Sequence, residues 1–157
     1  MSGNLRITRR EEAEAVWVVR DRVRFMGTVE GTELAVLEVE VPPGSGTPPH
    51  RHASPEIFRV LEGELTFGRF AEGPPALTTV GAGAVVTVPS DVPHNYQNLG
   101  PAPATMLVVV DQAMAAFFRD LGRTAEPPPG PPAPHELREV LDACARHGIT
   151  LLEGPPA

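Results

Sequence analysis

Residues 44–56 decide the fold and read Gly-Ser-Gly-Thr-Pro-Pro-His-Arg-His-Ala-Ser-Pro-Glu. In an extended chain the side chains of residues i and i+2 point to the same side, so His50 and His52 can present both imidazoles to one metal ion. Glu56 has the same parity, although Pro55 directly before it allows a bend. The stretch therefore predicts two histidines and a carboxylate gathered on one face of an extended segment.

The residues that follow Glu56 place this carboxylate beside an apolar surface. A strand that starts at Glu56 has Phe58 and Val60 on the same face, and we expect that face to lie inside a barrel. An apolar lining of this kind suits an aromatic or otherwise apolar substrate. The candidate pocket-lining residues are Phe58, Val60, Val88 and Tyr96.

A third histidine lies in a second segment, residues 83–98, where His94 opens a later strand. Three imidazoles and one carboxylate form a ligand set suited to first-row divalent metals. The expected cofactor is therefore a divalent transition metal, and Fe, Mn, Ni, Cu and Zn all remain open because such sets accept each of them. The alternative for any single histidine is an ordinary surface or hydrogen-bonded role, and only the full arrangement argues against it.

Both segments resemble the two conserved motifs of the cupin superfamily. The first motif is glycine, His-x-His, glutamate and glycine, and the matching residues are Gly44, His50, His52, Glu56 and Gly63. The second motif is glycine, proline, histidine and asparagine, and the matching residues are Gly83, Pro89, His94 and Asn98. Asp91 stands where the family usually has a second glycine, and aspartate tolerates the left-handed conformation of such a turn.

The resemblance implies an all-β fold, the double-stranded β-helix or jelly-roll barrel of the cupins. We assign the barrel to residues 1–111, with His50, His52, Glu56 and His94 holding the metal inside it. The chain also resembles single-domain cupins described as quercetin 2,3-dioxygenase-like. Short strand-like runs between residues 16 and 111 agree with this fold, and the first of them covers residues 16–25.

Residues 112–157 have a different character and form the expected α-helical C-terminal extension, not an independent domain. Apolar residues at helical spacing predict helices over residues 112–122 and 136–147, joined by a proline-rich connector over residues 123–134. Isolated helices of this length are marginal in water, so their apolar faces must pack onto something. We expect them to pack against the outer face of the barrel, either of the same chain or of its partner, and to supply no metal ligands.

The composition excludes several classes of function. All 13 basic residues are arginine, so no lysine is available for a Schiff base or a phosphate loop. The net charge of −7 without a basic run argues against nucleic-acid and membrane partners. A single cysteine, Cys144, and the absence of a signal-like segment favour a cytoplasmic protein. The expected partners are a small-molecule substrate and a second copy of the chain in a homodimer.

The favoured function is that of a metal-dependent dioxygenase acting on a small apolar or aromatic enol or polyphenol. In this interpretation Glu56 is the catalytic residue and accepts a substrate proton. One alternative is a metal-dependent isomerase or lyase, which uses the same ligands without O₂. Another is a non-enzymatic small-molecule-binding cupin, because fold alone does not decide among these functions.

Overall fold

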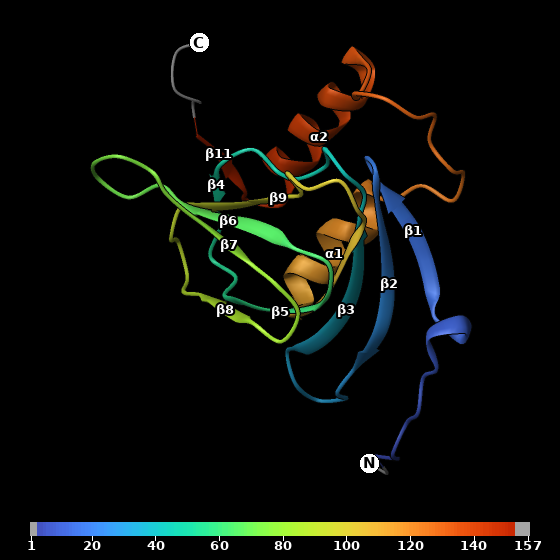
Figure 1. Cartoon of the computed structure of the whole chain (residues 1–157). Helices are drawn as coiled ribbons and strands as arrows, with labels where there is room; N and C mark the ends of the chain where they lie inside the picture. Colours follow the sequence, from blue (N-terminus) through green and yellow to red (C-terminus); the bar gives the residue numbers. More distant parts are fainter. Residues whose placement is uncertain (1–2, 153–157) are drawn as a thin grey trace.

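The computed structural model describes residues 3–152 and consists mostly of β-strands, with two helices near its C-terminal end. Two antiparallel sheets face each other and enclose the core (Figure 1). The elements are η1 (Arg10–Glu12), β1 (Glu14–Val18), β2 (Asp21–Thr28), β3 (Leu34–Val41), β4 (His50–Arg51), β5 (Glu56–Glu62), β6 (Leu65–Arg69), β7 (Ala76–Val80), β8 (Val85–Val88), β9 (His94–Gln97), β10 (Ala104–Asp111), α1 (Gln112–Leu121), α2 (Pro134–Arg146) and β11 (Thr150–Leu151).

The strand order shows how distant segments of the chain meet. The larger sheet has the order β1-β2-β3-β10-β5-β8, and the smaller sheet has the order β11-β4-β9-β6-β7. Strands that are neighbours in sequence therefore alternate between the two sheets over much of the chain, as in a jelly roll. The expected fold class, a β-barrel with a helical C-terminal extension, is confirmed.

Alternation of apolar residues builds the core. In β10, Met106 and Val108 are 1% and 2% exposed, while the residues between them are only partly buried. In β5 the same alternation buries Glu56, Phe58 and Val60, and leaves Ile57 44% exposed. A period of two places one face of each strand in the barrel, so Glu56 shares its face with two apolar side chains.

The first strand-like run, residues 16–25, was expected to be a single strand, and this expectation is wrong. The structure breaks it into β1 and β2, which pair as an antiparallel hairpin with Val18 opposite Asp21. Val19 and Arg20 form the turn, and Val19 has a φ of 55°, which is rare for a β-branched residue. Because neither turn residue is Gly, Asn, Asp or Pro, the sequence carries no ordinary hairpin signal here.

Other turns follow the expected chemistry. Gly63 has a φ of 74°, and a Cβ on it would lie 2.6 Å from the carbonyl oxygen of Pro103, so the tight β5–β6 turn requires glycine. Asp91, which replaces the usual glycine of the second motif, has a φ of 62°. Aspartate does adopt the left-handed conformation at this position, as the sequence predicted.

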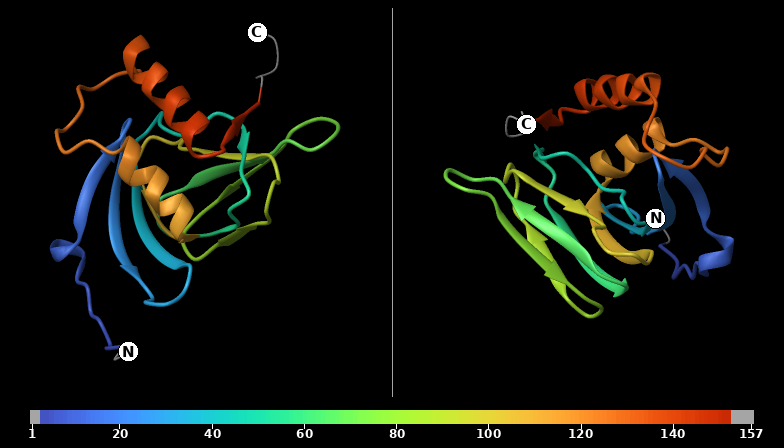
Figure 2. Two further views of the ribbon diagram at one scale, coloured as in Figure 1. Left: turned by 180° about the vertical axis from the view of Figure 1, so that it is seen from behind. Right: turned by 45° about the horizontal axis from the view of Figure 1, so that its top comes forward.

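The two predicted helices are present, but their expected position is wrong. Instead of covering the outer face of the barrel, α1 lies against β1, β2, β3 and β10 of the larger sheet, and α2 crosses over α1 (Figure 2). Their apolar side chains line the same cavity as the predicted metal ligands. Helical periodicity identifies the buried face of a helix but not its partner, which is why the sequence could not place them.

Ion pairs fix this helical cover in place. Arg20 donates to Glu136 at the start of α2 over 2.6 Å, and both side chains are largely buried. At the other end of α2, Arg146 and His147 both lie within 2.9 Å of an Asp120 carboxylate oxygen in α1. Neither helix within residues 3–152 is long and apolar enough to cross a membrane.

Candidate metal centre

Three separate strands bring the four predicted ligands together. His50 begins β4, His52 lies just after it, Glu56 begins β5 and His94 begins β9. One possible ligand atom from each residue lies within 4.8 Å of the others. His52, Glu56 and His94 are each no more than 6% exposed. The cluster is therefore compact, and only His50 is partly exposed.

The histidine rings are oriented by backbone carbonyl groups. The Nδ1 atoms of His50, His52 and His94 lie 2.9, 2.8 and 2.7 Å from the carbonyl oxygens of Pro48, Ser54 and Val92. Each of these contacts is made when Nδ1 carries the proton, which leaves Nε2 unprotonated in the neutral ring. Such hydrogen bonds are the usual means by which a metal-binding imidazole is held in one tautomer.

Glu56 lies between two of these rings. Its Oε1 atom is 2.9 Å from Nε2 of His52 and 3.2 Å from Nε2 of His94. Burial alone would raise the pKa of Glu56, but its contacts with the imidazoles of His52 and His94, which can carry positive charge, outweigh burial and lower the pKa to about 2. The cluster thus contains a carboxylate anion that attracts positive charge.

The imidazoles respond differently to the same surroundings. Burial and the neighbouring His94 lower the pKa of His50 to about 4, so His50 is neutral at pH 7. Burial also acts to lower the pKa of His52, but contact with Glu56 reverses the effect and raises it. A buried carboxylate with imidazoles whose Nε2 atoms converge is a donor set that fits a divalent transition metal.

A supporting network joins the cluster to the helical cover. The carbonyl of Ser54 contacts His52, and the Ser54 hydroxyl donates to Asp111 Oδ1 over 2.7 Å. The same Asp111 oxygen accepts the backbone N–H of Met114 and so caps α1. Asp111 was not predicted from the sequence, although an aspartate directly before a helical pattern is a recognisable N-cap signal.

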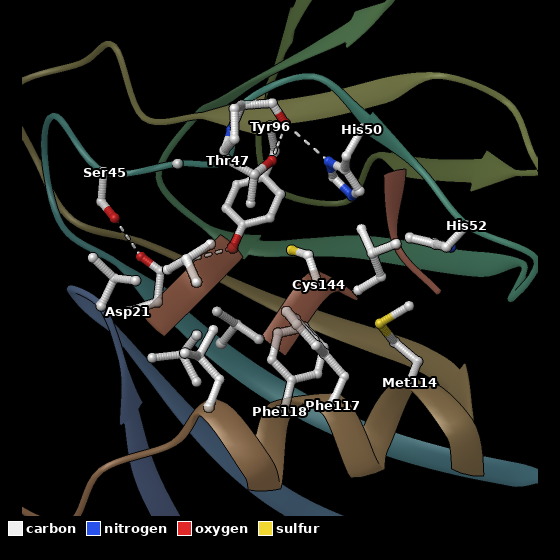
Figure 3. A pocket seen from close by; sticks show the side chains of 18 of the residues that line it. Asp21, Ser45, Thr47, His50, His52, Tyr96, Met114, Phe117, Phe118 and Cys144 are labelled. Atoms are coloured by element: carbon white, nitrogen blue, oxygen red, sulfur yellow. Dashed lines mark hydrogen bonds between the residues drawn. The ribbon is translucent and has the colours of Figure 1, made fainter. Parts of the chain in front are cut away.

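A largely apolar cavity of about 290 Å³ adjoins the cluster, which is near the lower end of the range for small-molecule sites. His50, His52, Glu56 and His94 form part of its wall, and α1 and α2 supply most of its apolar cover (Figure 3). Leu137 and Leu141 of α2 also line it and are 50% and 54% exposed, so the cavity approaches solvent along α2.

The structure separates the four candidate pocket residues into two groups. Phe58 and Tyr96 line the cavity, and their ring centroids are 6.3 Å apart. Val60 and Val88 are buried in the hydrophobic core and are not among the lining residues. Strand parity alone therefore identified the inward face of β5 but not how far along it the cavity extends.

A second buried carboxylate, Asp21, also lines this cavity and was not anticipated from the sequence. Its Oδ1 atom accepts a hydrogen bond from the Ser45 hydroxyl over 2.6 Å, and its Oδ2 atom accepts one from the Tyr96 hydroxyl over 2.5 Å (Figure 3). Burial raises the pKa of Asp21 to about 6, although both hydrogen bonds act to lower it. Residues 16–25 were interpreted as one strand, and that interpretation hid the position of Asp21 beside a turn.

Cys144 of α2 belongs to the hydrophobic core. It is 5% exposed, lines the cavity, and has a thiol pKa raised by burial. A raised pKa leaves the thiol protonated at neutral pH, which makes it a poor nucleophile.

Comparison with known proteins agrees with the fold and the site. Residues 37–110 match the family model described as "Cupin domain", and this range runs from within β3 to within β10 and includes all four clustered residues. Auxin-binding protein 1 of Arabidopsis thaliana is 32% identical over 103 residues, which cover 58% of this chain and 52% of that protein. The chain thus spans about half the length of this curated relative.

Solved structures show the same architecture. An RmlC-like cupin from Shewanella frigidimarina superposes with a TM-score of 0.62 at 19% identity, over 74% of this chain and 99% of that one. An oxalate oxidase superposes with a TM-score of 0.50 at 26% identity, over 59% of this chain and 51% of that one. With the two antiparallel sheets and the motif residues gathered at one site, these matches show that the chain has the cupin fold.

Proposed function

We propose that this protein is a metal-dependent cupin enzyme, and that its reaction is a dioxygenation of a small apolar or aromatic enol or polyphenol. The observation that carries the proposal is the position of the His50, His52, Glu56 and His94 cluster in the wall of an apolar cavity. A divalent transition metal in such a site supplies Lewis-acid polarisation of a substrate oxygen and, if it is redox-active, a route for electrons to O₂.

The residues of the chain have separate roles in this proposal. The histidine rings are held in their orientation by contacts between their Nδ1 atoms and backbone carbonyls, so that they can bind the metal. Phe58 and the aromatic side chains of α1 bind the apolar part of the substrate and exclude water. Glu56 accepts a substrate proton, since it is ionised at neutral pH and lies at the cavity wall.

Metal analysis of natively purified protein and oxygen uptake together test this function. Flavonols, catechols and β-diketones are presented to the protein with and without O₂, and the Glu56→Gln variant is measured alongside. We expect oxygen consumption with at least one of these classes, and a large loss of rate in the variant. Turnover of the same compounds without O₂ would instead indicate an isomerase or lyase.

A second candidate function is non-enzymatic binding of a small molecule. One of the matched relatives is named as an auxin-binding protein, and the enclosed apolar cavity suits ligand storage as well as catalysis. Saturable binding of a compound without its consumption, under aerobic and anaerobic conditions alike, would favour this function.

We also propose that the protein is a homodimer. β8 lies at one edge of the larger sheet and β7 lies at one edge of the smaller sheet, and open edges favour pairing with another chain. Light scattering at micromolar concentration should give about twice the 16.7 kDa mass of one chain, and a monomer mass would refute this.

A further inference from the structure

Among the acidic residues of the described range 3–152, Asp21 differs because it is buried in the cavity without a described cationic side chain beside it. It is 5% exposed, and its described hydrogen bonds come from the neutral hydroxyl groups of Ser45 and Tyr96. Each oxygen of a carboxylate can accept about two hydrogen bonds, so each Asp21 oxygen retains a free acceptor site. A buried charge that is only partly satisfied favours any additional donor that reaches it.

The position of Asp21 suits contact with a bound molecule. Asp21, Ser45 and the Tyr96 hydroxyl lie at one end of the view in Figure 3, and His50 and His52 lie at the other. Apolar side chains of α1 and α2 line the part of the cavity between these ends, and Phe117, Phe118 and Cys144 are labelled among them. A molecule that fills the cavity would therefore have its middle against apolar groups and a polar group within reach of each end.

The strand that carries Tyr96 reaches both ends of the cavity. Tyr96 lies two residues after His94 on β9, so one short strand carries both a predicted metal ligand and the hydrogen-bond donor to Asp21. Only 8% of Tyr96 is exposed, so little water competes for its hydroxyl group. The Asp21 carboxylate is thereby held in a fixed position relative to the cluster.

We propose that Asp21 is a second binding point of the cavity, and that it accepts a hydrogen bond from a hydroxyl or ammonium group on an otherwise apolar ligand. The proposal rests on the proposed function only in that the cavity receives a ligand; it does not depend on which metal is bound or on any reaction. It narrows the substrate to apolar molecules that carry a hydrogen-bond donor away from the group that meets the cluster.

Three probes of similar size separate the roles of charge, hydrogen bonding and apolar contact: benzylamine, benzyl alcohol and ethylbenzene. Their dissociation constants are measured by ligand-observed NMR at pH 7.5 for the wild-type protein and for Asp21→Asn. We expect the substitution to raise the dissociation constant of benzylamine by about tenfold or more and that of benzyl alcohol by a smaller factor, since hydrogen bonds between charged groups are stronger than those to a neutral donor. The affinity for ethylbenzene should not change.

Two further variants control for indirect effects. Asp142→Asn removes a carboxylate from an exposed position on α2 and should leave all three affinities unchanged. Tyr96→Phe keeps the aromatic ring and the Asp21 carboxylate, so benzylamine should still bind. Equal weakening of benzylamine in Tyr96→Phe and Asp21→Asn would show that the network only shapes the cavity, and would overturn the proposal.

Other outcomes also decide the matter. The proposal is wrong if none of the probes binds the wild-type protein, or if Asp21→Asn lowers the affinity for ethylbenzene as much as the affinity for benzylamine. Metal content is determined on the same samples, which separates this proposal from the proposed function. A wild-type protein that never binds metal but still discriminates among the probes would refute the proposed enzymatic function and support Asp21 as a binding point. A metal-loaded protein that does not discriminate among the probes would refute only the proposal about Asp21.

Discussion

His50 lies opposite Leu151 in the antiparallel pairing of β4 with β11. One member of the four-residue cluster is therefore held by a strand that follows α2, about a hundred residues later in the sequence. The next residue, Leu152, donates its N–H to the carbonyl of Pro49 over 2.9 Å, directly before His50. The C-terminal extension thus supports the predicted metal site as well as covering the cavity.

The β11 pairing can be tested with a single hydrogen bond. Leu152→Pro removes the N–H that reaches Pro49, and Pro is compatible with the extended backbone of the preceding residue. We expect weaker metal binding, because the backbone on which His50 lies becomes less constrained. Titration of the metal-free protein with Zn²⁺ measures the effect. Leu152→Ala, which keeps the N–H, is the matched control and should bind nearly as tightly as wild type.

A simpler prediction concerns metal binding by the four-residue cluster. His94→Ala should reduce the bound metal close to zero, because it removes an imidazole whose Nε2 atom converges on Glu56. His135→Ala is the control, since His135 is exposed at the start of α2 and lies outside the cluster. Elemental analysis of both purified variants checks this, and a normal metal content in His94→Ala would refute the assignment of the ligand.

Arg20 makes a prediction about the stability of the helical cover. Its side chain is 13% exposed, bonds to Glu136, and donates to the carbonyl of Gly130 over 2.9 Å. Arg20→Met should lower the free energy of unfolding by about 1–3 kcal/mol, because charge-assisted hydrogen bonds in a partly buried site are lost. Denaturant unfolding measures this difference.

The control for Arg20 is an ion pair of the same chemistry on the surface. Arg9 contacts Glu12 over 3.4 Å, and these side chains are 66% and 54% exposed. Arg9→Met should cost less than about 1 kcal/mol, because solvent screens such pairs. If the two substitutions lower the free energy of unfolding equally, the contacts of Arg20 stabilise the protein no more than an exposed ion pair does.

The parts of the site that follow from local periodicity were predictable from the sequence. The shared parity of His50, His52 and Glu56 is a property of an extended chain, and the structure does bring these side chains together with His94. The left-handed turn at Asp91 was implied by the resemblance to the second cupin motif, together with the tolerance of aspartate for this conformation. Each of these inferences needs only a few neighbouring residues.

The parts that depend on distant contacts were not predictable. Val19 adopts its positive φ in a turn whose neighbour Arg20 contacts residues 130, 131 and 136, more than a hundred positions away. Asp21 enters the cavity only because this turn exists. Likewise, the apolar faces of α1 and α2 were evident, but no local pattern says that they cover the barrel cavity and not its outer surface.

The buried Asp21 carboxylate leads to a prediction about stability and pH. Its pKa is about 6 in the folded protein, chiefly because of burial, against an ordinary value of 3.8. The folded state therefore binds this proton more tightly than the unfolded state does. Stability from this group is fully present below about pH 4 and is lost as the pH rises through 6. A difference of about two pKa units corresponds to about 3 kcal/mol.

The variant Asp21→Asn isolates this contribution because an amide of the same shape does not ionise. Between pH 4 and pH 7 the wild-type protein should lose about 3 kcal/mol of unfolding free energy relative to Asp21→Asn, since only the wild type must bury a charge at the higher pH. Urea unfolding of metal-free protein over this pH range measures the difference, and the histidines of the cluster cancel because both proteins contain them. Asp142→Asn should show no such pH-dependent difference. A difference between the two proteins that does not change with pH, or one in which wild type gains stability relative to Asp21→Asn as the pH rises, would mean that Asp21 is already ionised and well satisfied at low pH.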